Sequence, residues 1–92
     1  MIGSFKNEET RRIFERERSR RFGPLVRVIY RKLLQLDAAI AVDQLRSPPG
    51  NRLEVLRGDR VGQHSIRVND QWRICFVWRD GDVYAVEITE YH

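Results

Sequence analysis

Apolar and polar residues alternate through the second half of the chain, residues 48–92, between short turn signals. Apolar residues at every second position are typical of strands that bury one face and leave the other in water. The pattern therefore predicts a small antiparallel sheet with one apolar and one charged face. Over residues 25–36 the apolar residues recur at helical spacing instead, which predicts a helix that packs on the apolar face.

The turns set the strand register. Two-residue turns would place isoleucines opposite arginines, because a shift of one residue moves every side chain to the other face. Three-residue connections at residues 69–71 and 79–81, each ending in a left-handed residue, keep one face apolar. They pair Ile66 with Ile74, Val68 with Trp72, Phe76 with Tyr84 and Ile74 with Val86, and they place Trp72 and Trp78 on the apolar side.

The same register sets Arg67 directly opposite Arg73 on the polar face. Like charges that face each other destabilise a strand pair, so we expect an anionic partner here. The alternative is a solvated face whose arginines are separated by solvent screening. The other charged residues expected on or beside this face are Arg52, Glu54, Arg57 and Arg60, with Leu53 and Val55 turned to the core.

The first half predicts the remaining elements. Residues 1–5 suit an edge strand, Asn7 is an N-cap for a helix over residues 8–19, and Pro24 begins the second helix. Asp37 is expected to cap a short helical segment over residues 38–45. The layout is a two-layer α+β fold, and the length of 92 residues predicts a single domain over residues 1–92.

Composition favours a phosphate-bearing partner. The 17 Lys and Arg residues exceed the 13 Asp and Glu residues, giving a net charge of +4, and nearly all the basic residues are arginines. Arginine presents a planar fork that matches two phosphate oxygens at once. A GC-rich genome would produce the same bias without a functional reason.

Cysteine and histidine are scarce. Cys75 is the only cysteine, so there is no internal disulfide, and His64 and His92 form no metal-ligand pattern. The chain shows no signal-peptide core and no apolar run of membrane-spanning length. We therefore expect a soluble cytoplasmic protein without a metal or other cofactor.

The charged residues of the second half suit RNA cleavage by the RNA's own 2′-hydroxyl. That reaction needs a base, cations for the pentavalent transition state and an acid for the leaving oxygen, each acid–base partner contributing about 10²–10⁴ in rate. Candidates for the base are Glu54, Glu90 or His92, for the cations Arg57 and Arg73, and for the acid Tyr91 or His92. The plainer interpretation is that Glu54 simply forms an ion pair with a neighbouring arginine.

Several segments resemble a known family. The string SPPGNRLEVLRGDRVGQHSIRVNDQWRICFVW, the terminal EYH and the opening IGSFKN are similar to HigB-type toxins of the RelE/ParE superfamily, also called plasmid maintenance system killer proteins. The segments PPGNRLE and GDRVGQHSIRVNDQWR resemble the GraT-like subgroup in particular.

The resemblance implies a microbial-RNase-like fold and a metal-free, ribosome-dependent messenger RNA endonuclease. It also implies a HigA-type helix-turn-helix antitoxin, with DNA contacted only through the antitoxin complex. By position the catalytic residues are Glu54, Arg57, Arg73, Glu90, Tyr91 and His92, and the expected RNA-binding residues are Arg52, Arg57, Arg60 and Arg67.

This chain departs from some relatives, which can have His at position 54, Lys at 57 and Asp at 90. Because a histidine near neutral pKa is a ready acid or base, we expect slower cleavage here, with most of the catalysis from Arg73 and from positioning by the ribosome. The rival functions are a ParE-like inhibitor of DNA gyrase and a ribosome-binding module without chemistry.

Overall fold

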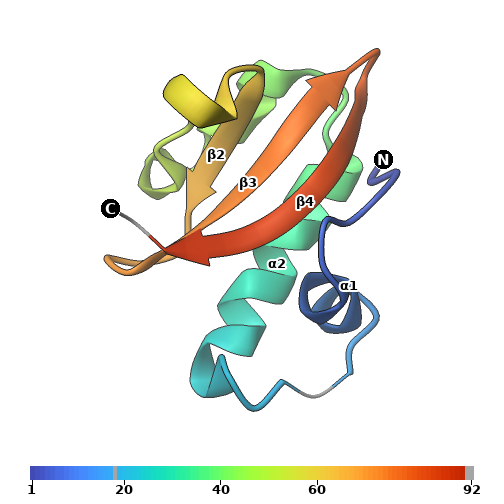
Figure 1. Cartoon of the computed structure of the whole chain (residues 1–92), viewed down its shortest axis with the longest axis vertical. Helices are drawn as coiled ribbons and strands as arrows, with labels where there is room; N and C mark the ends of the chain where they lie inside the picture. The colour runs from blue at the N-terminus through green and yellow to red at the C-terminus, as the bar shows by residue number, and fades with distance from the viewer. Residues whose placement is uncertain (18, 91–92) are drawn as a thin grey trace.

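The structure, a computed structural model, describes residues 1–17 and 19–90. Two α-helices cover one face of a four-stranded antiparallel sheet with strand order β1-β2-β3-β4 (Figure 1). This arrangement confirms the predicted two-layer α+β fold. The elements are α1 (Glu8–Phe14), α2 (Val26–Ala38), β1 (Glu54–Val55), β2 (Gln63–Arg67), β3 (Trp72–Arg79) and β4 (Asp82–Glu90).

The N-terminal segment runs along the free edge of β4, as predicted, but as two isolated parallel bridges instead of a continuous strand (Figure 1). Gly3 donates its amide to the carbonyl of Val83 at 2.7 Å. A Cβ atom on Gly3 would lie 2.5 Å from the ring of Tyr84, so a larger residue here would force that ring to move. The Asp37 carboxylate accepts the Ile2 amide at 2.8 Å and thus anchors this segment; the predicted capping role was wrong.

Helix α1 begins as predicted and ends earlier. The Asn7 side chain accepts the Thr10 amide at 3.0 Å, which caps the first turn. The helix stops at Phe14 and not near residue 19, because Arg16 takes a left-handed conformation with φ of 65°. The Arg16 amide then bonds the Ile13 carbonyl at 3.0 Å and closes the helix end.

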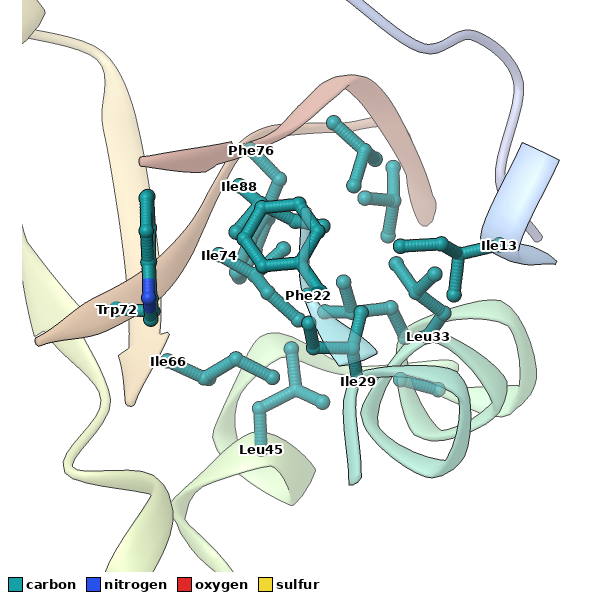
Figure 2. Close-up of a cluster of buried hydrophobic side chains, with 14 residues drawn as sticks. Ile13, Phe22, Ile29, Leu33, Leu45, Ile66, Trp72, Ile74, Phe76 and Ile88 are labelled. Carbon is teal, nitrogen blue, oxygen red and sulfur yellow. The ribbon is translucent and has the colours of Figure 1, made fainter. Parts of the chain in front are cut away.

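Helix α2 supplies the helical side of the core (Figure 2). Ile29, Leu33 and Leu36 are completely buried, as predicted from their spacing, while Val26 and Tyr30 are partly buried at the margin. Because α2 continues to Ala38, the predicted third α-helix does not form, and a 3₁₀ turn over Val42–Arg46 follows instead. No helix among the described residues is long and apolar enough to cross a membrane.

The register between β2 and β3 is the predicted one, with Ile66 beside Ile74 and Arg67 beside Arg73. The connecting loop contains no left-handed residue. Its closure comes from the Asn69 side chain, whose oxygen accepts the amides of Gln71 at 2.9 Å and Trp72 at 2.8 Å.

The predicted register between β3 and β4 was wrong. A two-residue turn at Asp80 and Gly81, with φ of 52° and 83°, pairs Arg79 with Asp82. The register then shifts by one residue in the region of Ala85, which has φ of 52°. A bulge adds one residue to one strand, so the apolar sides realign beyond it and Ile74 lies beside Ile88. Phe76 is therefore not paired with Tyr84, nor Ile74 with Val86.

The approach to β1 depends on a buried polar residue that the sequence analysis missed. Asn51 is completely buried, and its amide nitrogen lies within bonding distance of Gln35 Oε1 at 3.0 Å, the Leu45 carbonyl at 3.1 Å and the Ser47 carbonyl at 3.3 Å. Its oxygen accepts from Lys32 Nζ. Beyond it, Leu53 packs on the core as expected, whereas Val55 is exposed because it lies on the edge strand.

We expect Asn51→Ala to lower the free energy of unfolding by roughly 2–3 kcal/mol, because it leaves several buried groups without a partner. Urea denaturation of the two proteins measures this difference. Gln71→Ala, a polar truncation at an exposed residue, is the control. A loss for Asn51→Ala no larger than for this control would contradict the role assigned to Asn51.

Candidate functional site

Arg67 and Arg73 face each other on the sheet side opposite the helices, and each has an acidic partner. Arg73 Nη2 donates to Glu54 Oε2 at 3.1 Å, and its side chain is only 15% exposed. Arg67 forms an ion pair with Asp70 in the adjoining loop. The anionic partner expected at this arginine pair is thus supplied by the chain itself, as the carboxylates of Glu54 and Asp70. The plainer interpretation of Glu54, an ion pair with an arginine, is also met.

A cavity of about 260 Å³ opens beside Arg73 on this polar face. Three guanidinium groups reach it, two from the loop between β1 and β2 and one from β3. Because cations that converge around one space favour an anion there, the cavity suits a phosphate group. Its lining residues are Leu56, Arg57, Arg60, Arg73, Cys75, Thr89 and Glu90.

Arg60 and Arg57, the two arginines from the loop, differ in their surroundings. Arg60 Nη1 donates to Glu87 Oε1 at 2.7 Å and to Gln63 Oε1 at 3.2 Å. The hydrogen bond to Glu87 raises the pKa of Arg60, so this cation is permanent and fixed to β4. Arg57 is exposed and has no ion pair within the described part of the chain. Arg57 is therefore the cation most available to a ligand.

The remaining predicted site residues are less closely grouped. Glu90 pairs with Trp72 across β3 and β4, whereas Thr89 pairs with Arg73. Because side chains alternate between the faces of a strand, Glu90 belongs to the opposite face from Arg73, although it borders the cavity at the end of β4. Arg52 is exposed and does not line the cavity. Tyr91 and His92 lie outside the described residues.

Cys75 forms part of the cavity wall between the arginines. Its side chain is completely buried, and burial raises the pKa of the thiol, with Arg60 and Arg73 acting in the opposite direction. A neutral buried thiol is a poor nucleophile. Cys75 is therefore a small residue that fills space in the cavity wall. Cys75 and Thr89 line the cavity without having been predicted to, and the signal for both was the alternation of faces along β3 and β4.

His64 is structural. Its ring stacks on Phe76 with centroids 5.8 Å apart and an angle of 16° between the planes. Burial lowers the pKa of His64. Among residues 1–17 and 19–90, no group of three or more His, Cys, Asp or Glu side chains is arranged to hold a metal ion.

The lowered pKa of His64 predicts a pH dependence of stability. The unfolded chain binds this proton near the ordinary pKa of 6.5, and the folded chain only at lower pH. Folding therefore opposes protonation, and stability is lost as the pH falls below 6.5. We expect the urea midpoint to fall between pH 7.5 and pH 5.5, and to fall less in His64→Phe. Equal pH dependence in both proteins would show that His64 is not responsible.

The fold is shared with a solved structure. The structure matches a chain of the YoeB-YefM complex from Staphylococcus aureus with a TM-score of 0.61 at 16% identity, over 100% of this chain and 98% of that one. At this identity the likeness concerns the fold alone. It supports the α+β fold class of this chain.

Sequence comparison gives the family. The family model described as RelE-like toxin of type II toxin-antitoxin system HigB matches residues 3–92, so the chain belongs to the HigB-like toxins. The chain is 44% identical over 83 residues to Toxin HigB-1 of Vibrio cholerae, covering 88% of this chain and 87% of that one. It is 33% identical to Endoribonuclease HigB of Proteus vulgaris over 100% of both. The protein is thus a toxin of a type II toxin–antitoxin system, whose partner is an antitoxin.

Proposed function

We propose that this HigB-like toxin is an endoribonuclease that cuts messenger RNA on the ribosome, in the cytoplasm, and so inhibits translation and growth. The observation that carries the proposal is the cavity in which Arg57 and Arg73 meet, with the Glu54 carboxylate 3.1 Å from Arg73. The relative from Proteus vulgaris, named an endoribonuclease and matched over its whole length, supports it.

In the proposed reaction the 2′-hydroxyl of one nucleotide attacks the phosphate that links it to the next. The new bond joins O2′ to phosphorus, and the bond from phosphorus to O5′ breaks. The products are a 2′,3′-cyclic phosphate and a free 5′-hydroxyl. The attacking hydroxyl loses a proton and the leaving oxygen gains one, so the chain must supply a base and an acid but no oxidant or reductant.

Glu54 is the base in this proposal. Its carboxylate lies on the same face as Arg73 and is held by that side chain, so it is already oriented when the RNA arrives. Glu90 belongs to the other face, and we assign it a role in contacting RNA instead of transferring a proton. The acid for the leaving oxygen is assigned to Tyr91 or His92 by the family pattern alone.

Arg73 and Arg57 stabilise the transition state. The pentavalent phosphate carries an extra negative charge, and guanidinium groups placed around it in advance lower its energy without reorganisation. Arg73 is mostly buried, so its charge is less screened by water than that of an exposed arginine. Arg57, exposed at the cavity mouth, is suited to receive the phosphate first. Arg60, anchored by Glu87, contributes positive potential from the cavity wall.

The ribosome supplies what the small cavity does not. A site this open cannot by itself hold a flexible RNA in the in-line geometry that the attack requires. Fixing the reacting atoms can contribute several orders of magnitude in rate, and we assign that task to the ribosome. The proposed antitoxin is of the HigA helix-turn-helix type, with DNA bound only through the toxin–antitoxin complex.

Transcript mapping tests the proposed activity. The toxin is induced in a host without the antitoxin, and 5′ ends are mapped across all transcripts. We expect new 5′ ends inside translated regions, and far fewer with Glu54→Gln, which keeps the shape of the side chain and removes the base. Arrest with intact transcripts would favour a ribosome-binding module without chemistry. DNA damage without new transcript ends would favour a gyrase inhibitor.

A further inference from the structure

A second hollow lies on the other side of the end of β4. It has a volume of about 270 Å³ and is lined by Arg21, Trp72, Ile88, Thr89 and Glu90. Thr89 and Glu90 also line the cavity beside Arg73. The two spaces therefore meet at the last residues of β4, so an RNA strand that places a phosphate beside Arg73 can reach this hollow with a neighbouring nucleotide.

Arg21 forms a flat cationic platform at the hollow. It comes from the connection between α1 and α2, and its guanidinium lies over the ring of Trp72, 5.1 Å from the centroid, and 5.4 Å from that of Phe22. Arg21 Nη1 also forms an ion pair with Glu9 Oε1 at 3.5 Å. Trp72 itself is nearly buried at the margin of the core beside Phe22 (Figure 2). The Arg21 side chain is 59% exposed, so it keeps a surface on which a nucleobase can stack.

Glu90 adds a hydrogen-bond acceptor to the same hollow. Its pairing with Trp72 places both residues on one face of the sheet. Glu90 is exposed and takes part in no ion pair within residues 1–17 and 19–90. A carboxylate repels the phosphates of an RNA, but it accepts hydrogen bonds from the amino groups of bases. Its presence beside an arginine platform therefore fits a base edge better than a phosphate.

We propose that this hollow is a nucleobase subsite in which the base next to the cut stacks on Arg21 while Glu90 reads its edge. The inference rests on the proposed endoribonuclease function and adds a source of sequence preference to it. Adenine, cytosine and guanine each carry an exocyclic amino group that donates to a carboxylate. Uracil has no amino group, and its single edge donor, N3–H, lies between two carbonyl oxygens that repel a carboxylate. The subsite therefore selects against uridine at one fixed position beside the cleaved bond.

The test measures cleavage on ribosomes programmed with a set of messages that differ only in the bases around the cut. We expect the wild-type toxin to disfavour uridine at one position by about tenfold, the usual scale for one specific base contact. In Glu90→Gln we expect the rate on the preferred messages to fall to about the rate on the uridine message, so that the discrimination disappears, because an amide can donate to a uracil oxygen as well as accept. Loss of cleavage on every message to the same extent would overturn the proposal and make Glu90 catalytic.

The role of Arg21 is tested by comparing Arg21→Ala with Arg20→Ala. Arg21→Ala and Arg20→Ala each remove one exposed charge, but only Arg21 lies over the Trp72 ring. We expect Arg21→Ala to abolish the discrimination, and Glu90→Gln to have no further effect in that background, because an unstacked base is no longer presented to residue 90. Arg20→Ala keeps the discrimination.

The outcomes separate the two proposals. A wild-type toxin that cuts none of the programmed messages refutes the proposed function. If the wild type and every variant cut them with the same base preference, the function stands and the subsite is refuted. Thermal unfolding of each variant checks that the fold is retained.

Discussion

Arg73→Ala is expected to reduce cleavage of ribosome-bound messenger RNA by about 10²–10³-fold, the usual loss when one group that stabilises transition-state charge is removed. Arg73 is mostly buried at the cavity and lies beside the proposed base, Glu54. The substitution removes a cation from the reacting phosphate and also releases the carboxylate that it positions. Single-turnover cleavage on programmed ribosomes measures the chemical step separately from binding.

Arg79→Ala is the matched control for Arg73→Ala. Arg79 lies at the end of the same strand, β3, and its guanidinium stacks on Tyr84 at 4.5 Å, away from the cavity lining. Arg79→Ala removes the same charge from the protein as Arg73→Ala, so a general electrostatic effect on ribosome binding would reduce cleavage by both variants equally. Equal losses in the two proteins would mean that Arg73 has no special part in the reaction.

Phe76→Ala is expected to lower the free energy of unfolding by about 3–5 kcal/mol, which is the usual cost of removing a buried aromatic ring. Phe76 lies in the middle of β3 and is completely buried in the core (Figure 2). Its ring stacks against that of His64. The loss includes the transfer of the ring to water and the cavity that remains between sheet and helices. A small domain has few other core contacts with which to compensate.

Urea denaturation measures this cost. Val61→Ala, a truncation of an apolar side chain that is 75% exposed, is the control, and we expect its effect to stay within about 0.5 kcal/mol of the parent. A Phe76→Ala protein as stable as the Val61→Ala protein would contradict the packing described for β3.

The register of β2 and β3 could be predicted because one alignment alone keeps Ile66 and Ile74 on the same face. The register of β3 and β4 could not. The shift near Ala85 falls on a residue that the sequence does not mark, since alanine has no preference for φ of 52°. Without the shift, the two-residue turn at Asp80 would set Arg73 against Ile88, and that conflict favoured the wrong, longer turn.

The buried faces of the helices could be predicted from the spacing of apolar residues, but the helix ends could not. Spacing in α2 identified Ile29 and Leu33 as core. The end of α1 depends on the backbone of Arg16, and charged residues on a solvated surface contain no signal for a helix end. Asn51 was missed for a related reason. It stabilises the fold through hydrogen bonds to Gln35 and to two carbonyl groups, and these partners come together only in the folded chain.

For the candidate site, the sequence brought some of the residues together but did not predict their geometry. The resemblance placed Glu54, Arg57 and Arg73 together, and the structure has all three in or beside one cavity. Glu54 and Arg73 lie on strands that do not pair with each other, with β2 between them, so their contact is diagonal and no pairwise register predicts it. The partner of Arg67, Asp70, is local, and it was missed because the loop conformation decides which way its carboxylate turns.

The most direct test of the proposed chemistry removes one 2′-hydroxyl group from the substrate. A message is programmed on the ribosome with a 2′-deoxyribose at the single nucleotide whose hydroxyl would attack, and cleavage by the wild-type toxin is followed at that bond. We expect cleavage to be lost there, while the all-ribose message is cut to a 2′,3′-cyclic phosphate and a 5′-hydroxyl. Cutting of the deoxy-substituted bond at an undiminished rate would contradict the account, because the nucleophile would then not be the RNA itself.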